Sequence, residues 1–293
     1  MADIFDNIIT LPNAEVQKQT KSLVGFQSKF DRIYSNLKLL LDKDSLSDWS
    51  KKHHKVDLPI ISQLKDKYPL IILAGDAGTG KTISATSIAD KMTRELKKEG
   101  FFLKLSTRVR GEGMHGEMGK LVNDAFAELK SQAGKRRLAF LLIDEADAIA
   151  TTRATGQMHQ EEKAAVNTLI QKIDEVREMD GRAILFMSTN RLHFIDEAIL
   201  RRAAIILEFK RPTEEEYKEL YVQSLRGLNL RDAELSELAK LSMKEGEPVG
   251  YSFSDVRLKV LPEAVAMAYP SKPLSFDILK ETINNVKASP EIK

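Results

Sequence analysis

Cysteine is absent from the 293 residues of this chain, which excludes disulfide bonds and thiolate metal sites. The five histidines show no spacing typical of zinc ligands. No apolar run approaches the roughly 18 residues of a membrane span, and the opening residues MADIFDNIIT lack the basic start and apolar core of a signal peptide. Together these absences favour a cytoplasmic protein that does not enter a membrane.

A large excess of charge of one sign is also absent. Lysine and arginine number 45 and the acidic residues 43, which gives a net charge of +2 at pH 7. A balanced chain has no overall field that would draw it to nucleic acid or to an anionic membrane, so we expect neither partner. Hydrophobic residues make up 42% of the chain, which is enough to bury the core of a globular protein.

The strongest positive signal is the segment GDAGTGKT, which matches the phosphate-loop pattern G-x-x-x-x-G-K-[ST]. An apolar run at 70–73 predicts a buried strand before it, and a helix is predicted after it. The N–H groups of such a loop surround phosphate oxygens at the N-terminus of the helix. Lys81 is expected to reach the β- and γ-phosphates of ATP, and the Thr82 hydroxyl to bind Mg²⁺. The predicted ATP-binding residues of the loop are Gly75, Asp76, Ala77, Gly78, Thr79, Gly80, Lys81 and Thr82.

A second motif, DEAD, follows an apolar run at 138–143 that predicts another buried strand. Asp144 stands at the end of this strand and is expected to hold the Mg²⁺ of the nucleotide through its water shell. Glu145 is expected to orient and polarise the attacking water. The alternative is that these acids merely open a solvated helix, because carboxylates are favoured at a helix N-terminus.

A third predicted strand, 183–190, ends at Asn190. Open parallel sheets bind ligands at the carboxyl ends of their strands, so we expect Asn190 to position the same water. A simple turn residue is the alternative. A short last strand is predicted at 205–209. The alternation of strands and helices up to about residue 210 predicts an α/β fold, in which a parallel sheet is covered by helices on both faces.

Helical periodicity predicts which side chains face the core. Apolar residues recur on one face of three predicted helices. They are Ile83, Ile88, Met92 and Leu96 after the phosphate loop, Met118, Leu121, Val122, Ala125, Phe126 and Leu129 before the DEAD strand, and Val166, Leu169, Ile170 and Ile173 after it.

Beyond Pro212 the pattern predicts helices alone. Thr213 and Glu216 form a predicted capping box at the start of the first one. The predicted helices are 213–226, 232–245, 253–268 and 275–287. We therefore expect three parts, which are a short N-terminal extension (1–20), a large α/β nucleotide-binding domain (21–211) and a small helical lid domain (212–293).

The phosphate loop, LLIDEAD, STN, IDEAILRR and the helical lid together resemble an AAA+ ATPase over nearly the whole chain. The resemblance implies an enzyme that hydrolyses ATP with Mg²⁺. The segment 22–41 looks like the family's adenine-side segment, which places Gly25 among the expected ATP contacts. A lid arginine that senses the γ-phosphate is expected about where Ser254 stands, and Arg257 is the expected substitute.

Two stretches, GEMGKLVNDAF and AAVNTLIQKIDEV, are similar to the pachytene-checkpoint-type remodellers. The chain is most like the bacterial members found in CBASS anti-phage operons. That resemblance implies a homo-oligomeric ring, a hexamer, that threads or unfolds part of a HORMA-domain protein and so disassembles its complex. The expected context is regulation of a cyclic-oligonucleotide synthase (CD-NTase) that the HORMA protein binds.

The resemblance also implies roles for residues outside the nucleotide motifs. Arg201 and Arg202 stand in the family's position for an arginine finger that reaches the nucleotide of a neighbouring subunit, a role that suits a planar cation. Two ordinary surface arginines are the alternative. Met114 and His115 stand where relatives carry a pore loop that grips the client, and a connector without function is the alternative. Met158 and His159 are a second candidate pore contact.

Other functions fit part of the sequence. One alternative is an ATPase of the same fold that acts on nucleic acid or on a replication clamp. The balanced charge and the absence of an appended DNA-binding module argue against this alternative. Another is a nucleotide-dependent scaffold without turnover, which the presence of Glu145 and Asn190 opposes. A general AAA+ chaperone is the remaining alternative.

Overall fold

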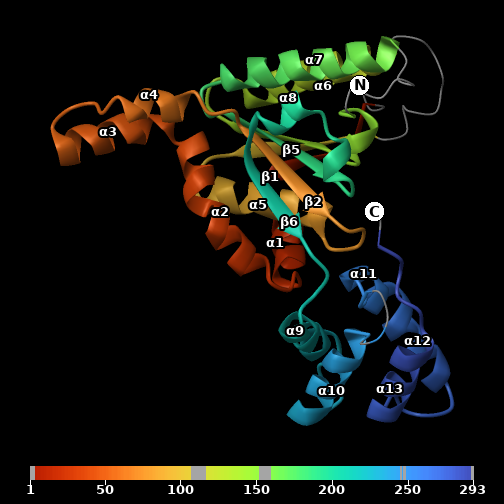
Figure 1. Cartoon of the computed structure of the whole chain (residues 1–293). Helices are drawn as coiled ribbons and strands as arrows, with labels where there is room; N and C mark the ends of the chain where they lie inside the picture. The colour runs from red at the N-terminus through yellow and green to blue at the C-terminus, as the bar shows by residue number, and fades with distance from the viewer. Residues whose placement is uncertain (1–3, 107–116, 152–159, 245, 247–248, 292–293) are drawn as a thin grey trace. The chain divides into compact units, whose positions relative to one another are not determined.

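The computed structural model describes residues 4–106, 117–151, 160–244, 246 and 249–291 (Figure 1). The chain divides into two compact units. The first comprises Met1–Thr20, Gln27–Ala74 and Thr82–Glu208, and the second comprises Lys21–Phe26, Gly75–Lys81 and Phe209–Lys293. The phosphate-loop segment therefore groups with the C-terminal helices. The predicted division into an extension, a nucleotide-binding domain and a lid stays a prediction.

Within the residues described, six strands form one sheet: β1 (Phe5–Leu11), β2 (Leu70–Gly75), β3 (Gly100–Leu105), β4 (Leu138–Ile143), β5 (Ala183–Thr189) and β6 (Ala203–Phe209). Their order is β1-β3-β4-β5-β2-β6. The pairs β3–β4, β4–β5 and β5–β2 are parallel, whereas β1 runs antiparallel to β3 at one edge. The predicted α/β fold is confirmed, and the sheet is mixed because of β1.

Helices cover both faces of this sheet. Figure 1 shows α6 (Glu117–Ala133) and α7 (Gln160–Arg177) along one face and α5 (Lys81–Glu95) on the other. The remaining helices of this part of the chain are α1 (Ala14–Lys21), α2 (Phe26–Leu41), α3 (Lys43–His54), α4 (Ile60–Lys65) and α8 (Glu197–Leu200), with short 3₁₀ turns at Ala146–Ala148 and Leu192–Phe194. No described helix has the length and apolar character needed to cross a membrane.

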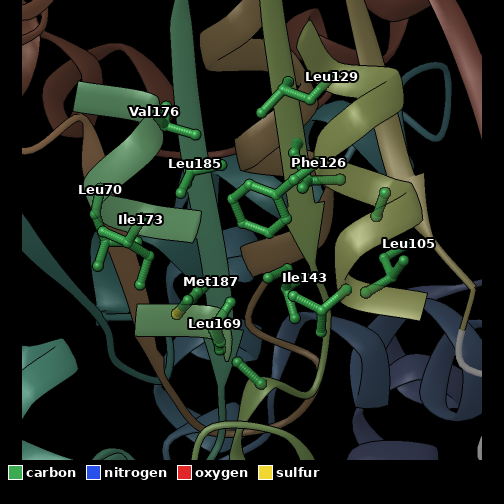
Figure 2. Close-up of a cluster of buried hydrophobic side chains, with 14 of the residues drawn as sticks. Leu70, Leu105, Phe126, Leu129, Ile143, Leu169, Ile173, Val176, Leu185 and Met187 are labelled. Carbon is green, nitrogen blue, oxygen red and sulfur yellow. The ribbon is translucent and has the colours of Figure 1, made fainter. Parts of the chain in front are cut away.

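The largest core lies between the sheet and the pair α6 and α7. Figure 2 shows Phe126 and Leu129 of α6 and Ile173 of α7 among side chains of the strands. The predicted faces of both helices are confirmed, with Met118 and Ile170 packed at the margin. Burying these apolar side chains stabilises the sheet and so fixes the strand ends that carry the polar motifs.

The prediction for Ile83 in α5 was wrong, because this side chain is 42% exposed. The buried apolar residues of the helix are Ala85, Ile88, Ala89 and Met92. Their spacing of three and four residues defines one face of a helix. Ile83 precedes Ala85 by two positions and therefore lies on the opposite side of the helix.

The sequence analysis did not predict the edge strand β1. Its residue Ile9 pairs with Phe102 of β3, and Leu11 pairs with Gly100. Just after the strand, the Asn13 N–H donates a 2.7 Å hydrogen bond to the Asp90 carboxylate of α5, a fully buried residue. These contacts attach the N-terminal segment to the rest of the first unit.

The second unit contains the C-terminal helices α9 (Glu214–Ser224), α10 (Asp232–Ser242), α11 (Phe253–Asp255), α12 (Leu261–Ala268) and α13 (Phe276–Asn285), with a π-helical turn at Val256–Val260. All four predicted helical stretches are present. The capping box is confirmed, because Thr213 Oγ1 accepts from the Glu216 N–H at 3.3 Å and the Glu216 carboxylate accepts from the Thr213 N–H at 3.1 Å.

The core of this unit includes three fully buried tyrosines, Tyr217, Tyr221 and Tyr251. Each hydroxyl has a partner. Tyr217 donates to the Tyr251 carbonyl, Tyr221 shares a 2.7 Å hydrogen bond with Ser242, and Tyr251 donates to the Val286 carbonyl at 2.6 Å. Because buried polar groups without partners are costly, these bonds allow large aromatic side chains to fill the core.

Candidate nucleotide-binding site

The three glycines of the loop Gly75–Lys81 all have a positive φ, and at two of them a side chain would also collide with neighbouring atoms. Gly75 has a φ of +144°, and a Cβ atom there would lie 2.0 Å from the carbonyl oxygen of Phe209. Gly78 has a φ of +74°, and its Cβ would lie 2.8 Å from both the Ser252 hydroxyl oxygen and the Ser254 Cβ. Another residue at either position would be strained and would collide with these atoms. The two glycines therefore fix the path of the predicted phosphate loop.

Lys81 is the first residue of α5 and is 7% exposed. Its Nζ donates to the carbonyl oxygens of Gly75 at 2.9 Å and Asp76 at 2.8 Å. The Thr79 hydroxyl donates to the same Asp76 carbonyl at 2.8 Å. A cation beside a glycine loop at a helix N-terminus is an arrangement that binds the phosphates of a nucleotide.

The carboxylate of Asp144, directly after β4, contacts the side chains of Thr82, Lys104 and Ser188. The Thr82 hydroxyl donates to Oδ2 at 3.0 Å, Lys104 Nζ lies 3.3 Å from the same oxygen, and the Ser188 hydroxyl donates to Oδ1. Burial raises the pKa of Asp144, but the hydrogen bonds from Ser188 and Thr82 and the charge of Lys104 outweigh burial and lower the pKa below its usual 3.8. Asp144 is therefore an anion at neutral pH.

Thr82 and Asp144 fit the donor set of a magnesium ion that is bound together with a nucleotide. Both side chains present oxygen, which Mg²⁺ prefers. Within the described ranges, no group of three or more His, Cys, Asp or Glu side chains is arranged to hold a metal. In nucleotide sites one or two protein oxygens suffice, since phosphate oxygens and waters complete the shell.

Glu145 and Asn190 follow neighbouring strands. Ile143, the last residue of β4, pairs with Met187 of β5, so the parallel register carries Glu145 and Asn190 to the same edge of the sheet. Glu145 is exposed and has left-handed backbone angles, φ 49° and ψ 47°. Near it, the Thr189 hydroxyl donates to the Asp147 carboxylate at 2.9 Å. This bond connects the chain that follows β4 with the end of β5.

The structure distinguishes the two predicted finger arginines. The Arg201 side chain is 81% exposed and pairs at 3.2 Å with Glu197, which is equally exposed. Arg202 makes a bidentate ion pair with Asp174, with N–O distances of 2.7 and 3.1 Å. Its guanidinium also lies 5.4 Å from the centroid of the Tyr68 ring. Arg202 is thus held by partners in the same chain, whereas Arg201 projects into solvent.

Three residues of the predicted adenine-side and lid regions lie in the second unit. Gly25 has a φ of +68°, within the segment Lys21–Phe26. Arg257 donates from Nη2 to the Ser22 carbonyl at 2.6 Å, which places it against that same segment. The Ser254 N–H donates to the Gly78 carbonyl at 3.1 Å. The position where the family's lid arginine is expected therefore contacts the phosphate loop through its backbone.

Sequence reasoning missed two cations that contact the predicted site. Lys104 of β3 lies close to Asp144, and Arg211 pairs with Asp76 of the phosphate loop at 2.5 Å. Neither cation belongs to a recognisable motif. A buried carboxylate in a loop needs a cationic partner, but the burial of Asp76 is apparent only in the folded chain.

Met114 and His115, the predicted pore-loop residues, lie outside the described residues, as do Met158 and His159. Their assignment stays a prediction from the sequence.

The fold and these motifs define the class of protein as a phosphate-loop ATPase with a helical C-terminal region. Residues 71–211 match the model of the ATPase family associated with various cellular activities (AAA). The chain belongs to this AAA ATPase family. The predicted AAA+ fold and the predicted enzyme class, an ATPase, are confirmed.

Individual relatives indicate which members of the AAA family this chain is similar to. CD-NTase-associated protein 6 of Escherichia coli strain KTE188 is 42% identical over 290 residues, which covers 99% of this chain and 97% of the relative. A chain in the solved E. coli MS115-1 HORMA:CdnC:Trip13 complex has a TM-score of 0.91 and 35% identity, with 99% and 98% of the two chains covered. Rhizobiales Trip13 has a TM-score of 0.76 and 28% identity, with 98% and 100% covered. These similarities confirm the predicted resemblance to bacterial remodellers of this type.

Proposed function

We propose that this protein uses ATP to remodel a HORMA-domain protein, and that it thereby regulates a CD-NTase in anti-phage defence. The observation that carries the proposal is the similarity, over 99% of the chain, to a chain of the HORMA:CdnC:Trip13 complex. The name of the relative at 42% identity, CD-NTase-associated protein 6, supports the same context.

The proposed chemistry assigns one role to each group of the nucleotide site. ATP supplies a γ-phosphoryl group whose transfer to water releases the free energy for work. Lys81 and the loop N–H groups bind the phosphates, and Thr82 and the ionised Asp144 hold Mg²⁺. Glu145 orients the attacking water and accepts its proton, and Asn190 fixes the position of that water. Gly25 and Arg257 add contacts to the nucleotide.

The proposed assembly is a homo-hexameric ring in which Arg201 of one subunit completes the nucleotide site of the next. The exposure of Arg201 supports this assignment. Its pair with Glu197 is a surface ion pair of small net stability, so a phosphate can replace the carboxylate at little cost. Arg202 has a different role in this proposal, since its pair with Asp174 orders its own subunit. Hydrolysis then depends on assembly.

In this ring, Met114 and His115 are proposed to grip an extended segment of the HORMA protein. Methionine adapts its shape to varied side chains, and the flat imidazole ring can lie between successive residues of a peptide. Cycles of hydrolysis would then pull this segment and disassemble the complex that the HORMA protein forms.

The test uses Glu145→Gln, which should bind ATP without hydrolysing it and so retain its client. We expect this variant to capture the HORMA protein with ATP and to release it with ADP. The wild-type protein with ATP should separate the HORMA protein from its CD-NTase. The matched control, Lys81→Ala, should do neither. An ATPase that is active but leaves the HORMA–CD-NTase complex intact would exclude remodelling, and stimulation by DNA instead of the HORMA protein would favour the nucleic-acid alternative.

A further inference from the structure

Arg211 joins the phosphate loop to two parts of the helical region, and all of these residues belong to the second unit. Its Nε and Nη2 atoms lie 2.6 and 2.5 Å from Oδ2 of Asp76. Nη1 donates to the Gly250 carbonyl, and Nη2 also donates to the Ser289 carbonyl at 2.8 Å. One planar guanidinium therefore connects the loop with the segment before α11 and with the chain that follows α13.

The ion pair at the centre of this connection is buried. The Arg211 side chain is 13% exposed and the Asp76 side chain 8%. Asp76 is also held at its backbone carbonyl, which accepts from Lys81 Nζ at 2.8 Å and from the Thr79 hydroxyl at 2.8 Å. Asp76 therefore binds Lys81 through its backbone carbonyl and Arg211 through its side-chain carboxylate.

A second set of contacts supports the same connection. The Ser254 N–H donates to the Gly78 carbonyl at 3.1 Å, at the start of α11. Asp255, in the same helix, lies 4.0 Å from Arg211 Nη1 and accepts from the Ser289 hydroxyl at 2.6 Å. Asp255 and Ser289 are thus connected with each other, and α11 is connected with the loop through Ser254.

The phosphate-loop pattern does not call for this pair. The pattern leaves the position after the first glycine open to any residue. A carboxylate there adds negative charge to a loop that binds an anion, unless a cation neutralises it. Because a buried carboxylate without its partner is costly, Asp76 and Arg211 depend on each other.

On the basis of the nucleotide site proposed above, we propose that the Asp76–Arg211 pair is a positioning contact that couples the phosphate loop to the helical region. To reach the phosphates, Lys81 has to leave the Asp76 carbonyl. That change alters the backbone of Asp76, whose side-chain carboxylate is bound to Arg211. The position of Arg211 then changes as well, and with it the hydrogen bonds that Arg211 donates to Gly250 and Ser289. Neither Asp76 nor Arg211 touches the reacting atoms through its side chain.

The test is a double-mutant cycle of Asp76→Asn and Arg211→Gln in the full chain. Binding is measured by titration with a fluorescent ADP analogue. Each single change should lower nucleotide affinity on the order of tenfold, within the usual range for residues in direct contact, and the double variant should be no weaker than the worse single variant. Amide hydrogen exchange at 250–256, measured with and without ADP, should lose its nucleotide-dependent protection in all three variants.

Lys280→Met is the matched control. It removes a cation of the same helical region that pairs at 2.6 Å with Glu237, a residue outside the phosphate loop. Affinity and nucleotide-dependent protection should both stay at the wild-type level. A merely structural role for Arg211 would lower the thermal stability of Arg211→Gln without changing its nucleotide-dependent exchange.

Additive single effects, or wild-type affinity and protection in Arg211→Gln, would overturn the positioning role. If Arg211→Gln does not fold, Asp76→Asn decides alone, because it leaves the bonds of Arg211 to Gly250 and Ser289 in place. Normal binding by Asp76→Asn, with binding lost in Lys81→Ala, would overturn this inference and leave the proposed nucleotide site standing. Normal binding by Lys81→Ala would instead overturn the nucleotide site itself.

Discussion

The Thr82 hydroxyl donates a 3.0 Å hydrogen bond to Oδ2 of Asp144, although 62 positions separate the two residues in the sequence. Thr82 comes from the phosphate-loop motif at the start of α5, and Asp144 comes from the DEAD motif at the end of β4. The fold therefore brings both predicted magnesium ligands together. This contact gives the proposed ATPase chemistry a definite location, which substitutions can test.

The first prediction separates nucleotide binding from hydrolysis. Lys81→Ala should weaken ATP binding strongly, because the loop loses its cation. Glu145→Gln should keep ATP affinity near the wild-type value and lower kcat by about 100-fold or more, because the water loses its base. Equilibrium binding and steady-state phosphate release, measured on the same preparations, check both statements. Normal turnover in Glu145→Gln would remove Glu145 from the mechanism.

The second prediction assigns different roles to two adjacent arginines. Arg201→Ala should reduce hydrolysis while leaving ATP affinity within a few-fold and thermal stability unchanged, because the side chain is exposed. Arg202→Ala should lower the free energy of unfolding by about 1 kcal/mol, since the pair with Asp174 is partly screened by solvent. Phosphate release and chemical denaturation of both variants provide the measurements.

Mixing experiments test whether Arg201 acts on a neighbouring subunit. If the proposed ring forms, mixtures of Arg201→Ala and Glu145→Gln subunits should regain some activity, because some interfaces then pair an intact arginine with an intact base. Arg202→Ala serves as the comparison. Mixed rings that form, as judged by co-purification, but never recover hydrolysis would exclude a finger in trans.

The third prediction concerns the buried Asp255, whose side chain is 2% exposed. Burial raises the pKa of Asp255, but hydrogen bonds from Lys259, Ser289 and Ser252 outweigh burial and hold the pKa well below the usual 3.8. Asp255→Asn should therefore lower the free energy of unfolding by about 3 kcal/mol at neutral pH. Glu237→Gln, at a surface ion pair, should lower it by less than about 1 kcal/mol.

The sign of the pH dependence follows from the lowered pKa of Asp255. The ionised carboxylate contributes its full stability at every pH above the unfolded value, and this contribution is lost as the pH falls through the folded pKa. The difference between wild type and Asp255→Asn should therefore be constant from pH 8 to about pH 5. Urea denaturation across that range checks this. A difference that grows or shrinks within the range would contradict the assigned pKa direction.

The sequence could predict the strands β4 and β5 because each is a continuous apolar run with a polar residue just after it. It could not predict β1, since Asp6, Asn7 and Thr10 interrupt the pattern and the strand forms only by pairing with the distant β3. At the candidate site, motifs predicted Thr82 and Asp144. Arg211 could not be predicted, because its partner Asp76 is 135 positions away and only the folded chain brings them together.

The last prediction returns to Met114 and His115, which the sequence assigns to a pore loop. If these side chains grip the client, they matter for mechanical work and hardly at all for bond cleavage. Alanine at both positions should leave basal ATPase activity within about two-fold of wild type, since neither side chain has a role in phosphoryl transfer. Release of the HORMA protein from its complex should fall sharply, because small side chains lose the contact area and dispersion that resist slippage.

An aromatic residue at Met114 provides the matched control for the double-alanine variant. It should preserve client release better than alanine does, because bulk is what the proposed grip requires. Client release and phosphate release have to be followed in parallel, on the same rings and with the same HORMA complex. A fall in both by the same factor would point to a general defect in the enzyme. If the double-alanine protein instead releases its client at the wild-type rate, Met114 and His115 do not grip the client, and the work must be transmitted through other residues.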